Sequence, residues 1–156
     1  MAFFVMLVKG QNYTQTVGVR GGLTSGITYR NHVNESLANE FILKMRRNEM
    51  NLTFLRVFYE PNNFGYSPKL MVYKGYGAHI GYRYDDRYTL LLREFVYSKE
   101  TFYPVLGFDV YLGAEYRIEE FPFIVGIDCK PFFEFSTRQI FRIYLPDIAF
   151  AIKYRF

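Results

Sequence analysis

The side chains of this chain that could support hydrolytic chemistry are two histidines, a serine and a glutamate. A nucleophilic hydroxyl needs an imidazole as base, and the imidazole needs a carboxylate to orient it. His79 or His32, with Ser25 and Glu115, would supply these three groups. Both histidines fall on the polar side of alternating segments, so a buried, hydrogen-bonded histidine is the competing interpretation. The choice between them depends on the elements that position these side chains.

Metal and cofactor chemistry find less support. Asp85 and Asp86, with Glu94, could bind a divalent cation, but their spacing matches no defined metal-binding loop, and a solvated acidic turn also accounts for them. Cys129 is the single cysteine, which excludes an internal disulfide and a zinc site built from several cysteines of one chain. We therefore expect neither a metal nor a cofactor.

Composition limits the class of protein. The 156 residues suffice for one domain, and 21% of them are aromatic, with 17 Phe, 15 Tyr and no Trp. No run of about 18 apolar residues occurs, so no transmembrane helix is predicted. The net charge of +4 could indicate a nucleic-acid partner, but the cations are spread singly and the longest run is Arg46-Arg47. We expect no nucleic-acid binding.

Alternation of apolar with polar or small side chains predicts about eight strands. They cover residues 16–20, 27–33, 37–46, 51–60, 69–83, 105–118, 121–131 and 148–156. The segment 105–118 is the clearest, because its apolar face is unbroken, whereas 37–46 also fits a helical period. Residues 84–101 are predicted to form the longest loop, and 132–147 a loop or the extended end of a strand.

The last strand is unusual because it ends the sequence with a large apolar face. That face carries Ile148, Phe150, Ile152, Tyr154 and Phe156. An apolar strand of this kind would be a poor edge for a soluble fold, although the last strand of a soluble sandwich stays an alternative. The terminal Phe after alternating aromatics resembles the closing strand of bacterial outer-membrane β-barrels. The resemblance implies that Phe150, Ile152, Tyr154 and Phe156 are read by the barrel-insertion machinery.

Further blocks extend this resemblance over nearly the whole chain. They are VGVRGGLTSGITYRNHVNE (17–35), YGAHIGY (76–82), GFDVYLGAEYRIEEFPF (107–123), GIDCKP (126–131) and the ending IKYRF. The chain resembles small outer-membrane β-barrel proteins of Bacteroidetes-type bacteria, eight-stranded barrels of the OmpX/OmpA type. The resemblance implies an all-β, eight-stranded antiparallel up-and-down transmembrane β-barrel in the outer membrane of a Gram-negative cell. It says little about function, and the chain departs from the family at 84–104 and at Cys129.

The polar faces of the predicted strands would line the inside of such a barrel. They carry Arg20, Arg30, His32, Glu40, Lys44, Arg46, Arg56, Glu60, His79, Arg83, Asp109, Glu115, Arg117, Asp128, Lys130, Lys153 and Arg155. An eight-stranded interior is only wide enough to be filled by side chains, and buried charges must be paired. We expect the acids Glu40, Glu60, Asp109, Glu115 and Asp128 to bridge to the cations, which makes a plugged barrel. Alternation alone does not say which face is inside, so a soluble calycin-like barrel with an apolar cavity stays open.

The amino-terminal residues predict export. Residues 1–11 resemble the remnant of a truncated signal peptide, with a rival interpretation as a strand or short helix, and residues 12–156 would form the barrel domain. The predicted role is structural or in surface interaction, with outer-membrane lipid around the wall and a partner bound through the loop 84–104. The rival is an enzyme acting on outer-membrane lipid, which would resemble the lipid A deacylases and need His79 or His32 on the lipid-facing side.

Overall fold

The described part of the chain is built from strands alone. The computed structural model describes residues 14–22, 25–46, 48–60, 69–90, 93–137, 141–144 and 147–156. None of these residues forms a helix that could cross a membrane. The predicted signal-peptide remnant, residues 1–11, lies outside the described residues.

Ten strand segments close into a single antiparallel barrel. They are β1 (Gln15–Gly22), β2 (Gly26–Asn34), β3 (Leu37–Arg46), β4 (Glu49–Glu60), β5 (Leu70–Leu90), β6 (Arg93–Arg117), β7 (Phe123–Cys129), β8 (Phe132–Ser136), β9 (Arg142–Tyr144) and β10 (Ile148–Arg155). Neighbours pair in the order β5-β4-β3-β2-β1-β10-β7-β6-β8-β9, and an additional β5–β6 pairing closes the ring. Both β7 and β8 pair with β6, on either side of Pro131, and β9 continues the line of β10 beside them. The wall is therefore an eight-stranded barrel.

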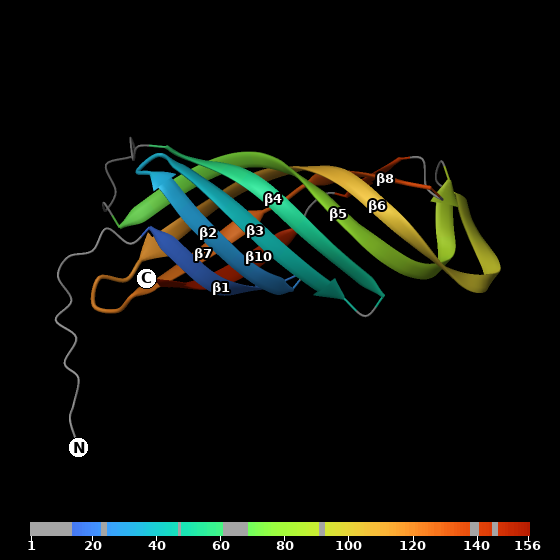
Figure 1. Cartoon of the computed structure of the whole chain (residues 1–156), viewed down its shortest axis with the longest axis horizontal. Coiled ribbons are helices and arrows are strands. Elements are labelled where there is room, and N and C mark those ends of the chain that lie inside the picture. Colours follow the sequence, from blue (N-terminus) through green and yellow to red (C-terminus); the bar gives the residue numbers. More distant parts are fainter. Residues whose placement is uncertain are drawn as a thin grey trace, which may run out of the picture.

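The start of β1 and the end of β10 lie at the same end of the barrel (Figure 1). Gln15 and Phe156 exchange two main-chain hydrogen bonds, of 3.3 and 3.0 Å, which complete the β1–β10 seam. We call this the terminal end. The opposite end, from which the β5–β6 hairpin extends, is the hairpin end (Figure 1).

The stretch 84–101 was predicted to be a loop, but in the structure it is part of the longest hairpin. β5 continues to Leu90 and β6 starts at Arg93, with a register shift between Asp85 and Arg87. The irregular pattern of apolar residues there is consistent with strands that have left the barrel wall, because no core then imposes a period of two. The side chains of 85–101 lie outside those that the structure describes.

Strand β3 resolves the helix–strand ambiguity of residues 37–46 in favour of the strand. Its inward side chains, Ala38, Glu40, Ile42 and Lys44, are buried, and ten consecutive registers pair it with β4. Because cross-strand partners share a face, this register also fixes the orientation of β4: Glu40 points inward, so its partner Leu55 does too.

The orientation of β4 corrects the sequence prediction. Arg56 and Glu60 were expected inside, but both are exposed on the outer wall, and Arg56 pairs in register with the outward Tyr76. Both faces of β4 carry large apolar residues, such as Leu52 and Phe54 outward and Leu55 inward, so its alternation does not choose a face.

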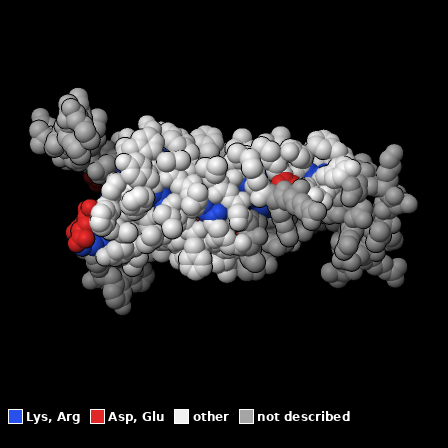
Figure 2. Space-filling model, turned by 90° about the horizontal axis from the view of Figure 1, so that it is seen from below, with Lys and Arg blue, Asp and Glu red and all other residues white. Residues whose placement is uncertain are grey.

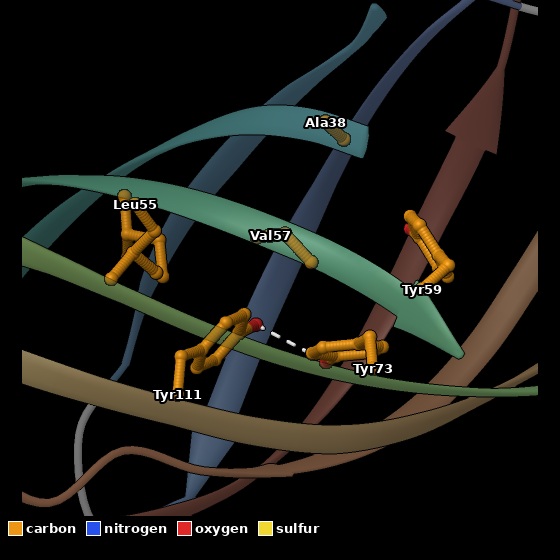
Figure 3. Packing of buried hydrophobic residues seen from close by; sticks show 7 residues of the cluster. Ala38, Leu55, Val57, Tyr59, Tyr73 and Tyr111 are labelled. Atoms are coloured by element: carbon orange, nitrogen blue, oxygen red, sulfur yellow. Dashed lines mark hydrogen bonds between the residues drawn. The ribbon is translucent and has the colours of Figure 1, made fainter. Parts of the chain in front are cut away.

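The inward residues of β4 instead build an apolar side to the lumen (Figure 3). The cluster consists of Ala38, Ile42, Leu55, Val57, Tyr59, Tyr73 and Tyr111. The hydroxyl of Tyr73 donates to that of Tyr111 at 3.3 Å, and the two rings lie 5.2 Å apart. The lumen is thus filled by tyrosines and aliphatic side chains as well as by charges.

Glycines make room for the largest inward side chains. A Cβ on Gly113 of β6 would lie 2.5 Å from Cζ of Tyr73 and 2.9 Å from the carbonyl oxygen of Ile127. Such distances are shorter than real contacts allow, so this position is restricted to glycine by close approach.

The described part of the outer wall carries few charges. In Figure 2 the barrel shows mostly uncharged surface, with small patches of charge on the wall and a concentration of charge at one end. Every strand presents large apolar side chains outward, from Val19 on β1 to Ile152 on β10. Among the strand residues whose side chains are described, the charged ones that point outward are Arg56, Glu60 and Lys74, and all three lie toward the terminal end of β4 and β5.

Candidate functional site

Four charged side chains form a closed ring across the lumen. We call Arg30, Glu40, Glu115 and Lys153 the inner quartet. Arg30 lies 2.5 Å from Glu40 and 2.8 Å from Glu115, while Lys153 lies 3.0 Å from Glu40 and 2.6 Å from Glu115. The four come from β2, β3, β6 and β10, and each is no more than 1% exposed. Two cations and two carboxylates balance, so no net charge is buried.

Neutral donors and aromatic faces complete the coordination of the inner quartet. Thr28 and Tyr59 supply hydroxyls to it: Thr28 donates to Glu40, and Tyr59 donates to Glu115 at 3.3 Å. The guanidinium of Arg30 also lies over the ring of Tyr73, 4.7 Å from its centroid. Buried charges satisfied on this many sides are held in one geometry, since each lost contact would leave an unpaired group.

Arg20 anchors a second contact across the seam of the barrel. Its guanidinium lies 2.5 Å from Asp128 of β7 and 3.4 Å from Asp147, which directly precedes β10. Tyr111 donates to the other oxygen of Asp128 at 3.3 Å, which links this pair to Tyr73 and, through its ring, to the inner quartet.

A third group of charges lies toward the hairpin end, and we call it the hairpin-side cluster. It consists of Lys44, Glu49, His79, Arg83, Asp109, Lys130 and Glu134. Glu49 lies 2.9 Å from Lys44 and 3.0 Å from Arg83, and Arg83 reaches Glu134 at 2.9 Å. Asp109 accepts from Lys130 at 2.6 Å and lies 2.7 Å from Nδ1 of His79, and Nε2 of His79 lies 3.6 Å from Glu134, which joins the two sets of contacts.

The structure brings together most of the predicted lumen residues. Arg20, Arg30, Glu40, Lys44, His79, Asp109, Glu115, Asp128, Lys130 and Lys153 lie in these three groups. Arg56 does not, because it lies on the outer wall, and Glu60 contacts Lys74 there instead of a lumen cation. The side chain of Arg46 is outside those described.

Arg117 and Arg155 lie apart from the three groups, at the terminal end. They line a cavity of about 530 Å³ together with Thr16, His32 and Met71, which we call the terminal cavity. Arg155 donates to the main-chain carbonyls of Ile118 and Phe121 at 3.0 and 3.3 Å, in the β6–β7 turn. Nearby, outside the wall, Lys69 donates to Glu119 at 2.9 Å, and this hydrogen bond raises the pKa of Lys69.

Three acids of the lumen were missed by the sequence analysis. Glu49, Glu134 and Asp147 are buried and pair with Arg83 or Arg20. The alternation of the neighbouring strands could have identified them as inward residues. Asp147 continues the inward series of Ala149 and Lys153, and Glu134 continues that of Asp128 and Lys130 past Pro131. This alternation was not used, because Glu49 was assigned to a turn and residues 132–147 to a loop or the extended end of a strand.

The candidate hydrolase residues are not assembled. His79 is enclosed between Asp109 and Glu134, and its ring packs on Phe132 at 5.3 Å. His32 stacks on Tyr59 near the terminal end, whereas Ser25 precedes β2 at the hairpin end. Among the residues whose side chains are described, no group of His, Cys, Asp and Glu could hold a metal ion. The candidate cation site of Asp85, Asp86 and Glu94 lies outside those side chains.

The predicted insertion residues share the outer face of β10. Phe150 and Ile152 are exposed, and the ring of Tyr154 packs between those of Phe123 and Phe156, with centroids at 5.6 and 6.4 Å. These contacts lie outside the lumen, so the side chains stay accessible from outside the wall.

No protein-family model matches the chain, and no curated protein matches it.

Proposed function

We propose that this protein is a transmembrane β-barrel of a bacterial outer membrane, with a salt-bridged lumen and a structural or surface-interaction role. The proposal rests on the distribution of polar and apolar side chains, which is the reverse of that in a soluble barrel. Large apolar side chains cover the outside of every strand, while the charged side chains are buried within. Soluble barrels have the opposite arrangement, because exposed apolar patches above a few hundred Å² favour association or aggregation.

The free energy of hydration supports a lipid environment. In water, the large apolar side chains of the outer wall would keep 36–69% of their surface exposed, and that part of their surface would contribute nothing to folding. In a bilayer the same side chains are transferred to hydrocarbon, which contributes about 25 cal/mol per Å². Closure through the β1–β10 and β5–β6 pairings also satisfies strand edges that an open sheet would leave unpaired, as strands in lipid require.

The few charges on the outer wall agree with a membrane boundary near the terminal end. Arg56, Glu60 and Lys74 lie within a few residues of the terminal ends of β4 and β5. A lipid-facing Arg or Lys costs about 2–4 kcal/mol at the bilayer midplane but only about 0–1 kcal/mol near the interface. In this orientation the terminal end faces the periplasm and the β5–β6 hairpin faces the exterior.

The filled lumen argues against a wide pore. The inner quartet and the hairpin-side cluster span the interior at two levels, with Tyr73 and Tyr111 between them. Opening a passage would require separation of buried ion pairs, which costs several kcal/mol for each group left unpaired. The surface role rests on the β5–β6 hairpin. Its strands continue beyond Arg83, where the pairing of β5 with β4 ends, so a partner could add a strand to the free edge.

The two rival functions receive less support. A calycin-like barrel would place its apolar face inside, but the charged groups lie there. A lipid hydrolase would need a serine beside a histidine near the lipid-facing rim, whereas His79 is 3% exposed and Ser25 lies at the opposite end of β2 from His32.

A tryptophan placed on either wall face tests the proposal directly. The chain has no Trp, so each substitution introduces a unique fluorophore. Phe132 and Phe133 are a matched pair, because they are adjacent and identical but point inward and outward, at 4% and 40% exposure. In vesicles that contain brominated lipid, we expect strong quenching of Phe133→Trp and weak quenching of Phe132→Trp.

Localisation and closure need a second measurement. The full-length protein should fractionate with the outer membrane and migrate differently on gels before and after heating. Equal quenching of the two tryptophan variants, or a protein that stays monodisperse in water without detergent, would overturn the proposal. Stepwise nanosiemens currents in planar bilayers would overturn the plugged lumen alone.

A further inference from the structure

The terminal cavity is a pocket with a closed floor. It measures about 530 Å³, within the range of small-molecule sites. His32 lines it and stacks on Tyr59 with ring centroids 5.3 Å apart, and the hydroxyl of Tyr59 bonds to Glu115 of the inner quartet. The stacked pair of His32 and Tyr59 therefore lies between the cavity and the inner quartet.

The cavity differs from the rest of the lumen in its charge pairing. Each cation of the three inner groups lies within 3.4 Å of a carboxylate, for example Lys153 at 2.6 Å from Glu115. Arg117, by contrast, makes no ion pair with any residue that the structure describes. A half-buried guanidinium in this position favours an anion, and Arg recognises carboxylate and phosphate through paired N–H donors.

A second polar group points to the same kind of ligand. Thr16 lines the cavity and is 2% exposed, and its Oγ1 has no hydrogen-bond partner among the described residues. Buried hydroxyls are normally hydrogen-bonded, because an unsatisfied one costs free energy. Thr16 is on β1 and Arg117 on β6, so the two donors approach the cavity from different strands.

The rest of the lining sets the size and polarity of the ligand. Met71 and Ile124 add apolar surface, and the ring of His32 adds an aromatic one. Glu35, in the β2–β3 turn, is the single carboxylate among the described lining residues, against Arg117 and Arg155. A ligand with one negative group and a short apolar body satisfies both parts of the wall.

We infer that the terminal cavity binds a small organic oxyanion, a carboxylate or a phosphate ester, with its charged group at Arg117 and Thr16 and its apolar body against Met71 and Ile124. This inference requires the closed barrel but not its location in a membrane. If the proposed orientation holds, the ligand enters from the periplasm.

The two histidines provide a built-in assay. His32 lines the cavity, whereas His79 is enclosed in the hairpin-side cluster and serves as internal control. We would label the full chain, purified without a histidine tag in dodecyl maltoside, with ¹³C at histidine Cε1 and assign the two signals with His32→Asn. Titration with benzoate and with phenyl phosphate separates the two anion classes, and benzyl alcohol is the neutral control.

The expected result is a saturable shift of the His32 signal alone, with a Kd on the order of 1 mM for at least one anion. Arg117→Gln should raise that Kd about tenfold, since a charge-assisted hydrogen bond is lost, and Thr16→Val should raise it less. Arg56→Gln, on the outer wall, should leave it unchanged. Each variant is first checked for the heat-dependent gel shift, which reports folding independently.

Three outcomes would overturn the inference: no shift with either anion, equal shifts of His32 and His79, or binding that is unchanged in both Arg117→Gln and Thr16→Val. A shift caused by benzyl alcohol as strongly as by benzoate would also overturn it, because the apolar wall alone would then account for binding. Failure of these tests with an intact gel shift leaves the proposed membrane barrel standing.

Discussion

Neutralisation of Glu115 should strongly destabilise the barrel. Glu115→Gln keeps the shape of the side chain but leaves Arg30 and Lys153 with Glu40 as their single carboxylate. The side chains of all four are at most 1% exposed, so water cannot replace the lost charge. Removal of one partner from a buried ion pair costs about 3–5 kcal/mol, and we expect a loss of this size.

A double-mutant cycle separates the electrostatic contribution from packing. Lys153→Met alone leaves two carboxylates with Arg30 and should also cost about 3–5 kcal/mol. The double variant restores balance, with Arg30 and Glu40 as a one-to-one pair. Its loss should therefore not exceed that of either single variant, whereas independent effects would sum to about 6–10 kcal/mol.

The assay is equilibrium unfolding by guanidinium in a fixed neutral detergent, approached from the folded and the unfolded side. Far-UV circular dichroism and the heat-dependent gel shift report the same transition. Glu119→Gln is the control, because the Lys69–Glu119 pair has a similar distance of 2.9 Å but is exposed, and it should cost less than about 1 kcal/mol. Additive losses in the cycle, or a loss below that of the control for Glu115→Gln, would refute the reasoning.

Three further changes test the packing, the membrane boundary and the assembly residues. Gly113→Ala should destabilise the folded state by about 1–3 kcal/mol, because its Cβ would lie 2.5 Å from Cζ of Tyr73, and Gly21→Ala, with nothing within 4 Å of its Cβ, should not; equal unfolding midpoints would contradict this. If the outer wall faces lipid as proposed, Arg56→Leu should leave stability in vesicles unchanged or raise it by up to about 1 kcal/mol, as for a cation near an interface, and a clear loss would point to an inward role. Phe156→Ala should lower the yield of assembled barrel in cells but not refolding in detergent, because the main-chain bonds of Phe156 to Gln15 at 3.0 and 3.3 Å remain; loss of both would indicate a stability effect instead.

The sequence by itself determined the strands with one apolar and one polar or small face. In β6, Leu106, Phe108 and Val110 alternate with Gly107 and Asp109, and the structure has the first set exposed and the second buried. A period of two over more than ten residues leaves no other regular element, because a helix would scatter these residues around its axis. The same argument applies to β10.

The sequence did not determine the orientation of β4. Its two faces are both apolar in part, so the choice of Arg56 or Leu55 for the interior depends on the β3 register and not on composition. The predicted strands also ended too early at the hairpin end of the barrel. Glu134 and Asp147 were assigned to a loop or the extended end of a strand and not to the lumen, although each is the partner of a buried arginine.

Which charges meet was decided by tertiary structure alone. Arg30 and Glu40 are neighbours in register across β2 and β3, but Glu115 and Lys153 reach them from β6 and β10, across the barrel. Closure also decided which face is inside, since alternation is identical for a barrel and for its inverse. The small inward residues, such as Gly113 beside Tyr73, allow only the polar face to fit the narrow interior.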